Sequence, residues 1–199
     1  MGSIWEFLLV ALVVTLTPGP ATALVLRVAA RDGRRAALGT VVGNSMGVLM
    51  WATLSAVGVS SLILASQVAY DVLRFGGAAL LIVLGVRSLL RRDSDDAPAP
   101  LPRLTGWRIG VVTSAANPKL AVFFVALFPQ FLSPGTSVLV PALLMGVVIV
   151  LYDIAWFSLL AWSVDRAGRA LRPRIRRLME RTTGAVLIGL GVRVAAEAR

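Results

Sequence analysis

The chain contains no cysteine and no histidine, and only 10 of its 199 residues are acidic. The absence of cysteine excludes disulfides and thiolate nucleophiles, and the absence of histidine removes imidazole acid–base chemistry. Without either residue type, a zinc site of the usual kind cannot be built. These absences exclude most soluble-enzyme chemistries, so the sequence predicts no catalytic residue, no metal site and no cofactor.

Long apolar runs dominate what is present. Hydrophobic residues make up 57% of the chain, and the mean hydropathy is +0.83. About 20 consecutive apolar residues are enough for a helix to cross the hydrocarbon core of a bilayer. The sequence therefore predicts an all-α membrane protein with six transmembrane helices, at roughly 4–26, 36–65, 72–90, 109–132, 138–163 and 182–196.

Basic residues are concentrated in three of the five connecting loops. Arginine and lysine are retained in short cytoplasmic loops, so their distribution predicts orientation. The loops 66–71 and 133–137 contain none, which predicts that both chain ends face outward. The same rule, together with contact to anionic membrane lipids, explains the net charge of +10 without a nucleic-acid partner. The basic loop residues are Arg27, Arg31, Arg34, Arg35, Arg87, Arg91, Arg92, Arg103, Arg108, Arg166, Arg169, Arg172, Arg174, Arg176, Arg177 and Arg181.

A charged, proline-rich segment divides the chain. Residues 91–102 read RRDSDDAPAPLP and cannot form a packed element. The sequence predicts a first three-helix repeat at 1–90, a cytoplasmic linker at 91–108 and a second three-helix repeat at 109–199. Because each half has an odd number of spans, the second must enter the membrane in the opposite sense, as in the inverted repeats of many secondary transporters.

Proline interrupts the first span of each half. The first is broken at Pro18-Gly19-Pro20 and the fourth at Asn117-Pro118. Proline has no N–H for the carbonyl four residues back, and a free carbonyl in lipid is costly. A simple packing kink explains any one proline. Two breaks in corresponding positions favour a binding site, and the carbonyls predicted to be free belong to Val14, Leu16 and Ser114.

Two ionisable side chains lie inside predicted spans, at similar depth. Lys119 is in the fourth span and Asp153 in the fifth, and such charges are retained in membranes where they pair or face a cavity. Helical rise places Asn44 and the proline breaks in the same layer. A lined cavity is predicted, to which Tyr152 could contribute a wall. A structural Lys119–Asp153 ion pair is the alternative.

Glycine recurs every four residues in the second span, at Gly39, Gly43 and Gly47. Small residues at this spacing let another helix backbone approach closely. The partner helix could belong to the same chain or to a second copy, so a homodimer remains open.

The segments LTPGPATALVL, RDGRRAALGTVVGNSMG and NPKLAVFFVALFPQF, with Asp153 in the fifth span, resemble the lysine exporter and homoserine/threonine resistance family of amino-acid exporters. The resemblance covers nearly the whole chain. It implies a six-span bacterial inner-membrane protein that exports amino acids, driven by protons. Alternatives are export of another small solute or a metal ion, and a membrane-embedded hydrolase using Ser114 and Lys119.

These considerations together suggest how a zwitterionic amino acid would bind. Its carboxylate is expected at Lys119, at Asn44 or at the N–H groups that follow Pro20. Its ammonium is expected at Asp153 or at the free carbonyls of the first break. Asp153 is also the expected proton carrier, because its surroundings would alternate between paired and desolvated during transport.

Overall fold

The computed structural model describes residues 4–65, 67–90, 104, 106–131 and 139–167, together with residues 185, 188, 189, 192 and 196. Within these residues all regular secondary structure is helical, as the sequence predicts. The elements are α1 (Ile4–Leu16), α2 (Pro20–Asp32), α3 (Arg34–Ala65), α4 (Gln67–Leu90), α5 (Trp107–Ala115), α6 (Pro118–Val122), the π-helical η2 (Phe123–Leu127), the 3₁₀ helix η3 (Phe128–Phe131) and α7 (Leu139–Ala167).

Two of the described helices are long and apolar enough to cross a membrane alone, within Arg34–Gly58 and Leu139–Val164. Up to four crossings result if α1 with α2, and α5 with the segment Pro118–Phe131, each form one bent span. The sixth predicted span, at 182–196, lies outside the described residues except for the single positions named above. The six-span count therefore stays a prediction.

Two predicted boundaries differ from the structure. The third helix was expected at 72, but α4 begins at Gln67 and includes most of the predicted outer loop. Hydropathy marks where a segment enters lipid, whereas a helix continues as long as its backbone hydrogen bonds do. Of the predicted linker 91–108, residues 91–103 and 105 lie outside the described residues, and α5 already begins at Trp107.

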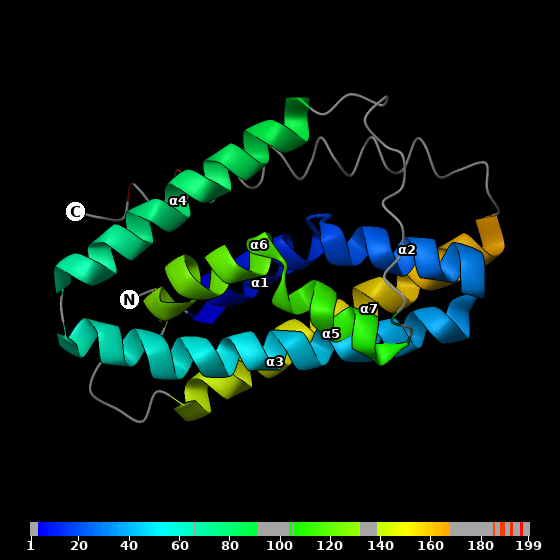
Figure 1. The fold of residues 1–199 in the computed structure, drawn as a ribbon, viewed down its shortest axis with the longest axis horizontal. Helices are drawn as coiled ribbons and strands as arrows, with labels where there is room; N and C mark the ends of the chain where they lie inside the picture. Colours follow the sequence, from blue (N-terminus) through cyan, green and yellow to red (C-terminus); the bar gives the residue numbers. More distant parts are fainter. Residues whose placement is uncertain are drawn as a thin grey trace.

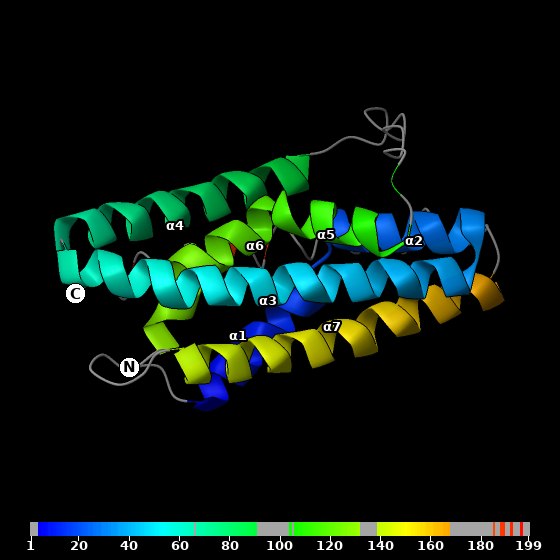
Figure 2. The same ribbon diagram turned by 60° about the horizontal axis from the view of Figure 1, so that its bottom comes forward.

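The long helix α3 packs most extensively against α5 and α7 (Figures 1 and 2). Its glycines make this approach possible: a Cβ atom at Gly43 would collide with the backbone of Trp107, and one at Gly47 would collide with Ser114. A Cβ atom at Gly110 of α5 would likewise collide with the carbonyl oxygen of Thr40. The glycine surface of α3 is therefore filled by a helix of the same chain.

Two apolar clusters fill the interior. One contains Phe7, Phe123 and Phe128, and its aromatic rings meet edge to face, with the Phe7 and Phe128 centroids 6.2 Å apart. The other contains Val25 and Phe157. Along α3 and α7, the polar residues Asn44 and Asp153 fall between the stretches that join one cluster and those that join the other.

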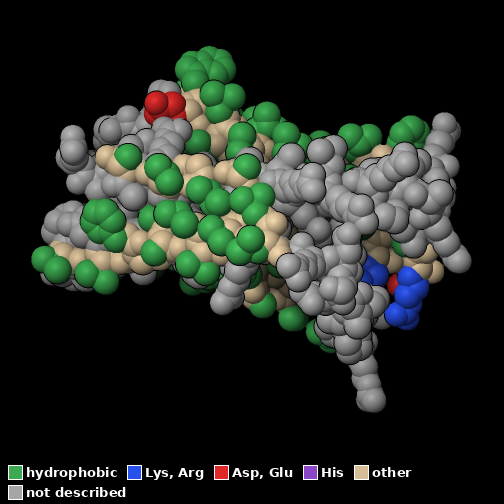
Figure 3. All heavy atoms as spheres, turned by 90° about the horizontal axis from the view of Figure 1, so that it is seen from above, with side chains coloured by type: hydrophobic (Ala, Val, Ile, Leu, Met, Phe, Trp, Pro, Cys, Tyr) green, Lys and Arg blue, Asp and Glu red, His purple; other side chains and the backbone are tan. Residues whose placement is uncertain are grey.

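The outer surface of the described helices is largely apolar. Figure 3 shows hydrophobic side chains over much of one face, with lysine and arginine gathered toward one end of the molecule. Trp5, Leu9, Leu144 and Leu151 are each more than half exposed. Apolar exposure of this extent suits a lipid environment and would be a liability in water.

Candidate functional site

Both predicted helix breaks are present in the structure. The axes of α1 and α2 differ by 48°, and α5 and the segment that begins at Pro118 differ by 52°. Each second helix begins at a proline, which tolerates the first helical position because its missing N–H would have no partner there. At the second break, the Asn117 side chain caps the new helix by accepting from the Lys119 backbone N–H at 3.1 Å.

Two of the three carbonyls predicted to be free have side-chain donors. The Val14 carbonyl accepts a hydrogen bond from Lys119 Nζ at 2.9 Å, and the Thr17 carbonyl accepts a second at 2.6 Å. The Ser114 carbonyl accepts from Trp51 Nε1 at 3.2 Å and from the Asn117 backbone N–H at 3.1 Å, so the prediction that it is free is wrong, because the last turn of α5 tightens before Pro118. Lys119 follows the proline of the second break, so its side chain connects the second break to the first.

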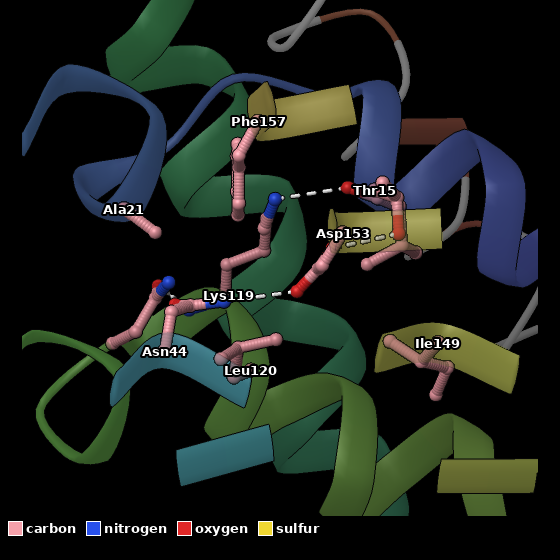
Figure 4. Close-up of a pocket in the computed structure, with 10 residues that line it drawn as sticks. Thr15, Ala21, Asn44, Lys119, Leu120, Ile149, Asp153 and Phe157 are labelled. Atoms are coloured by element: carbon pink, nitrogen blue, oxygen red, sulfur yellow. Dashed lines mark hydrogen bonds between the residues drawn. The ribbon is translucent and has the colours of Figure 1, made fainter. Parts of the chain in front are cut away.

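Asp153 is held by hydrogen-bond donors from two other helices. Thr15 Oγ1 of α1 donates to one carboxylate oxygen at 3.0 Å, and Asn44 Nδ2 of α3 donates to the other at 2.9 Å. The residue is 5% exposed. Three helices therefore converge on one buried carboxylate (Figure 4). Charge-assisted bonds of this kind are about twice as strong as neutral ones, and they offset part of the cost of burying the charge.

Lys119 and Asp153 line the same cavity without touching. Between these two described residues no ion pair within 4.0 Å is formed. Carbonyl dipoles stabilise the charge of Lys119, and an amide and a hydroxyl stabilise the charge of Asp153. The direct ion pair considered as an alternative from the sequence is therefore wrong for this conformation, because each group has a closer partner on another helix.

The cavity between these groups is very small, with a volume of about 10 Å³. A cavity of this size has room for about one water molecule. Its polar lining comes from Thr15, Asn44, Asn117, Lys119 and Asp153 (Figure 4). Apolar side chains, including Leu120, Ile149 and Phe157, complete the wall. In this conformation the polar side chains therefore leave little space between them.

The nine residues predicted for the site fall into three groups. Asn44, Asn117, Lys119 and Asp153 line the cavity. Gly19 lies behind them, where a Cβ atom would be 3.5 Å from Lys119 Cε. The remaining four, which do not line the cavity, are Pro18, Pro20, Pro118 and Tyr152. The prolines shape the breaks that expose the carbonyls, and Tyr152 packs against the phenylalanine-rich cluster.

Two contributors were not predicted from the sequence. Thr15 donates to Asp153, and Trp51 donates to the carbonyl of Ser114. A signal existed for Thr15, since it is a polar residue in an apolar run directly before a break. No comparable signal marks Trp51, because tryptophans of membrane proteins commonly lie at the membrane–water interface.

The two chemical alternatives find no support in the described residues. No group of three or more potential metal ligands among His, Cys, Asp and Glu occurs in the part of the chain that the structure describes. Ser114 Oγ is buried without a hydrogen-bond partner among the described residues, while Lys119 Nζ donates to two carbonyls. A serine–lysine dyad is therefore not formed in this structure.

Comparison of the sequence with known proteins provides evidence that is independent of the structure. The family model described as LysE type translocator matches residues 12–198. A leucine efflux protein of Enterobacter sp. strain 638 is 30% identical over 206 residues, covering 96% of this chain and 94% of the relative. The homoserine/homoserine lactone efflux protein of Salmonella typhimurium strain LT2 is 25% identical, covering 96% and 95%. The threonine efflux protein of Escherichia coli strain K12 is also 25% identical, covering 92% and 93%. No solved structure matches the chain.

Proposed function

Because this chain belongs to the LysE type translocator family, and is therefore a multi-pass bacterial membrane transporter, we propose that it exports amino acids or their close derivatives from the cytoplasm. The relatives named above are efflux proteins for leucine, threonine, homoserine and homoserine lactone. All four compounds carry an α-ammonium group next to a carbonyl carbon. The buried cavity with opposite charges on separate walls is the observation that carries this proposal.

The charges of Lys119 and Asp153 match the two charges of a zwitterion. The ammonium of Lys119 has three N–H donors, of which two bond to the carbonyls of Val14 and Thr17. The third can bind a substrate carboxylate without breaking the other two. A carboxylate oxygen accepts more than one hydrogen bond, so Asp153 can bind a substrate ammonium while Thr15 and Asn44 still donate to it. Because Lys119 and Asp153 do not bond to each other, each can still accept or donate a hydrogen bond to a substrate.

Substrate entry requires the cavity to expand. A volume of about 10 Å³ is too small for any amino acid. The two breaks supply hinges, because each divides a helix into segments that already differ in direction by 48° or 52°. Hinges are a few residues at element ends that absorb the change in backbone angles. Lys119 connects one hinge to the other, and its two bonds to the first break resist separation of the segments.

We propose in addition that the two halves form inverted repeats and that Asp153 couples export to protons. The first proposal is supported by the correspondence between the breaks, each followed by a helix that begins at a proline. The second rests on Asp153 being the buried acid of the site, since intramembrane carboxylates commonly mark proton relays. A carboxylate that loses its donors when the cavity opens would change its proton affinity during the cycle.

Efflux measurements test the proposed function. Cells that express the protein would be loaded with dipeptides of leucine, threonine or homoserine, and the amino acids released would be measured over time. Faster efflux of at least one of these three, compared with cells carrying Asp153→Asn at equal membrane abundance, is expected. The efflux of other small solutes would be measured in the same cells, to test the alternative that the protein exports one of these. Accelerated efflux of only those solutes would contradict amino-acid export.

A further inference from the structure

Only one of the two polar atoms of the Asn44 side chain, the amide nitrogen, forms a hydrogen bond with a described residue. Its Nδ2 donates to Asp153 at 2.9 Å, but its Oδ1 is buried and has no hydrogen-bond partner among the described residues. The residue is 2% exposed and lines the cavity. A buried acceptor left unpaired costs free energy, so a functional explanation is required.

The orientation of the amide is fixed by chemistry. An ionised carboxylate only accepts hydrogen bonds, so the amide nitrogen must face Asp153 and the amide oxygen must point elsewhere. The sequence-based expectation gave Asn44 to the substrate carboxylate, which would require a free amide donor. In the structure one N–H of that nitrogen bonds to Asp153, so the oxygen, which has no partner among the described residues, and the second N–H are the groups left for a ligand.

An acceptor beside a carboxylate fits a particular kind of ligand. A nitrogen that carries positive charge and at least two N–H groups can donate to Asp153 and to Asn44 Oδ1 at the same time. A trimethylated ammonium carries the same charge but has no N–H to donate. A hydroxyl has one donor and no charge. The pair therefore recognises the number of N–H groups as well as the charge.

We propose that Asn44 Oδ1 and Asp153 together form the ammonium subsite of this transporter and restrict its substrates to compounds with a primary or secondary amine. This inference rests on the proposed amino-acid export and deepens it. Asn44 is then a specificity-determining residue. Lys119, which lies on a different helix from either member of this pair, binds the opposite end of the substrate.

Binding measurements on the full-length purified protein test the subsite apart from transport. Leucine, threonine and homoserine would each be compared with their N-methyl, N,N-dimethyl and N,N,N-trimethyl forms by calorimetric titration. The unsubstituted amino acid is expected to bind at least about tenfold more tightly than its trimethyl form, the size of effect expected for a hydrogen bond between a charged and a neutral group.

Substitution separates recognition from simple size exclusion. Asn44→Leu keeps the branched shape of the side chain but removes both the acceptor and the donor to Asp153, and Asn44→Ala provides a second variant if the first does not fold. In either variant the ratio of the two affinities is expected to fall about fivefold or more. Ser45→Ala is the matched control, because the neighbouring Ser45 hydroxyl donates to the Val41 carbonyl of its own helix.

The outcomes discriminate between roles. Thr15→Val removes the other donor to Asp153 and keeps the Asn44 acceptor, so it measures the effect of positioning alone. A ratio that falls no further in the Asn44 variants than in Thr15→Val overturns the proposal. Failure of all three amino acids to bind the parent protein also overturns it. Retained discrimination without export in the efflux assay contradicts the proposed function and leaves the ammonium subsite standing.

Discussion

Lys119 Nζ donates to the carbonyl oxygen of Val14 at 2.9 Å, although the two residues are 105 positions apart in the chain. Val14 lies four residues before Pro18, and Lys119 directly follows Pro118. The carbonyl is free because Pro18 has no N–H to offer it. The break in one half of the chain thus creates the acceptor, and the break in the other half positions the donor.

Lys119→Met should destabilise the protein. The change leaves two carbonyls at the first break without their donor and removes a positive charge near the buried Asp153. We expect a loss of about 1–3 kcal/mol in the free energy of unfolding, the usual cost of stranded buried polar groups. Thermal unfolding in detergent measures it. Arg108→Met, at an exposed position beside Trp107, serves as the control, and equal stability of the two variants would contradict the role of Lys119.

Combining Lys119→Met with Asp153→Asn should not restore transport. A structural ion pair predicts that neutralising both partners recovers function, because neither charge is left unpaired. The structure instead gives each residue its own hydrogen-bond partners. We expect export driven by a pH gradient in proteoliposomes to be lost in Asp153→Asn, with or without the change at 119, while exchange of substrate without a gradient persists. Gradient-driven export by the double variant would remove Asp153 from the proton pathway.

Removing the prolines at both breaks should abolish export without preventing membrane insertion. In Pro18→Ala combined with Pro118→Ala, the new N–H at position 18 can bond to the Val14 carbonyl and compete with Lys119. Straighter helices would then lack the hinge. Efflux and membrane abundance would be measured together. Pro141→Ala, in the first turn of α7, is the control and should export normally. Full export by the double variant would reduce both breaks to packing kinks.

Gly43→Ala should disrupt the packing of α3 on α5. A Cβ atom there would collide with the Trp107 backbone, which cannot move aside as a flexible side chain can. We expect the melting temperature to fall, with a cost of about 1–3 kcal/mol typical of overpacking. At Gly58 on the same helix no atom lies within 4 Å of the added Cβ, so Gly58→Ala should leave stability unchanged or slightly raised. Equal melting temperatures would contradict the close helix approach.

The predicted orientation can be tested by cysteine labelling, since the natural chain contains no cysteine to interfere. Single cysteines at Ser66 and Gly135 should react with a membrane-impermeant reagent added outside intact cells. Cysteines at Arg31, Asp95 and Arg172 should react only after the membrane is opened. Labelling of 66 and 135 from the cytoplasmic side would overturn both the orientation and the inverted repeat.

The sequence by itself determined the class of the protein, the place of both breaks and the residues that carry charge inside the membrane. Each of these follows from a free-energy cost that depends on local sequence. The costs are those of exposing a long apolar segment to water, of a carbonyl that lacks a donor because proline has no N–H, and of a charge within an apolar run. Such costs are read from neighbouring residues. For this reason Pro18, Pro118, Lys119 and Asp153 could all be singled out before any packing was known.

Only the tertiary structure decided which groups bond to one another. Asp153 binds Thr15, 138 residues away, and Asn44, 109 residues away, in preference to Lys119. Which side chains meet depends on how each helix is rotated and tilted. Rotation here is set by contacts such as those between the glycines of α3 and the backbone of α5. Hydropathy gives the depth of a residue in the membrane but not the direction in which its side chain points.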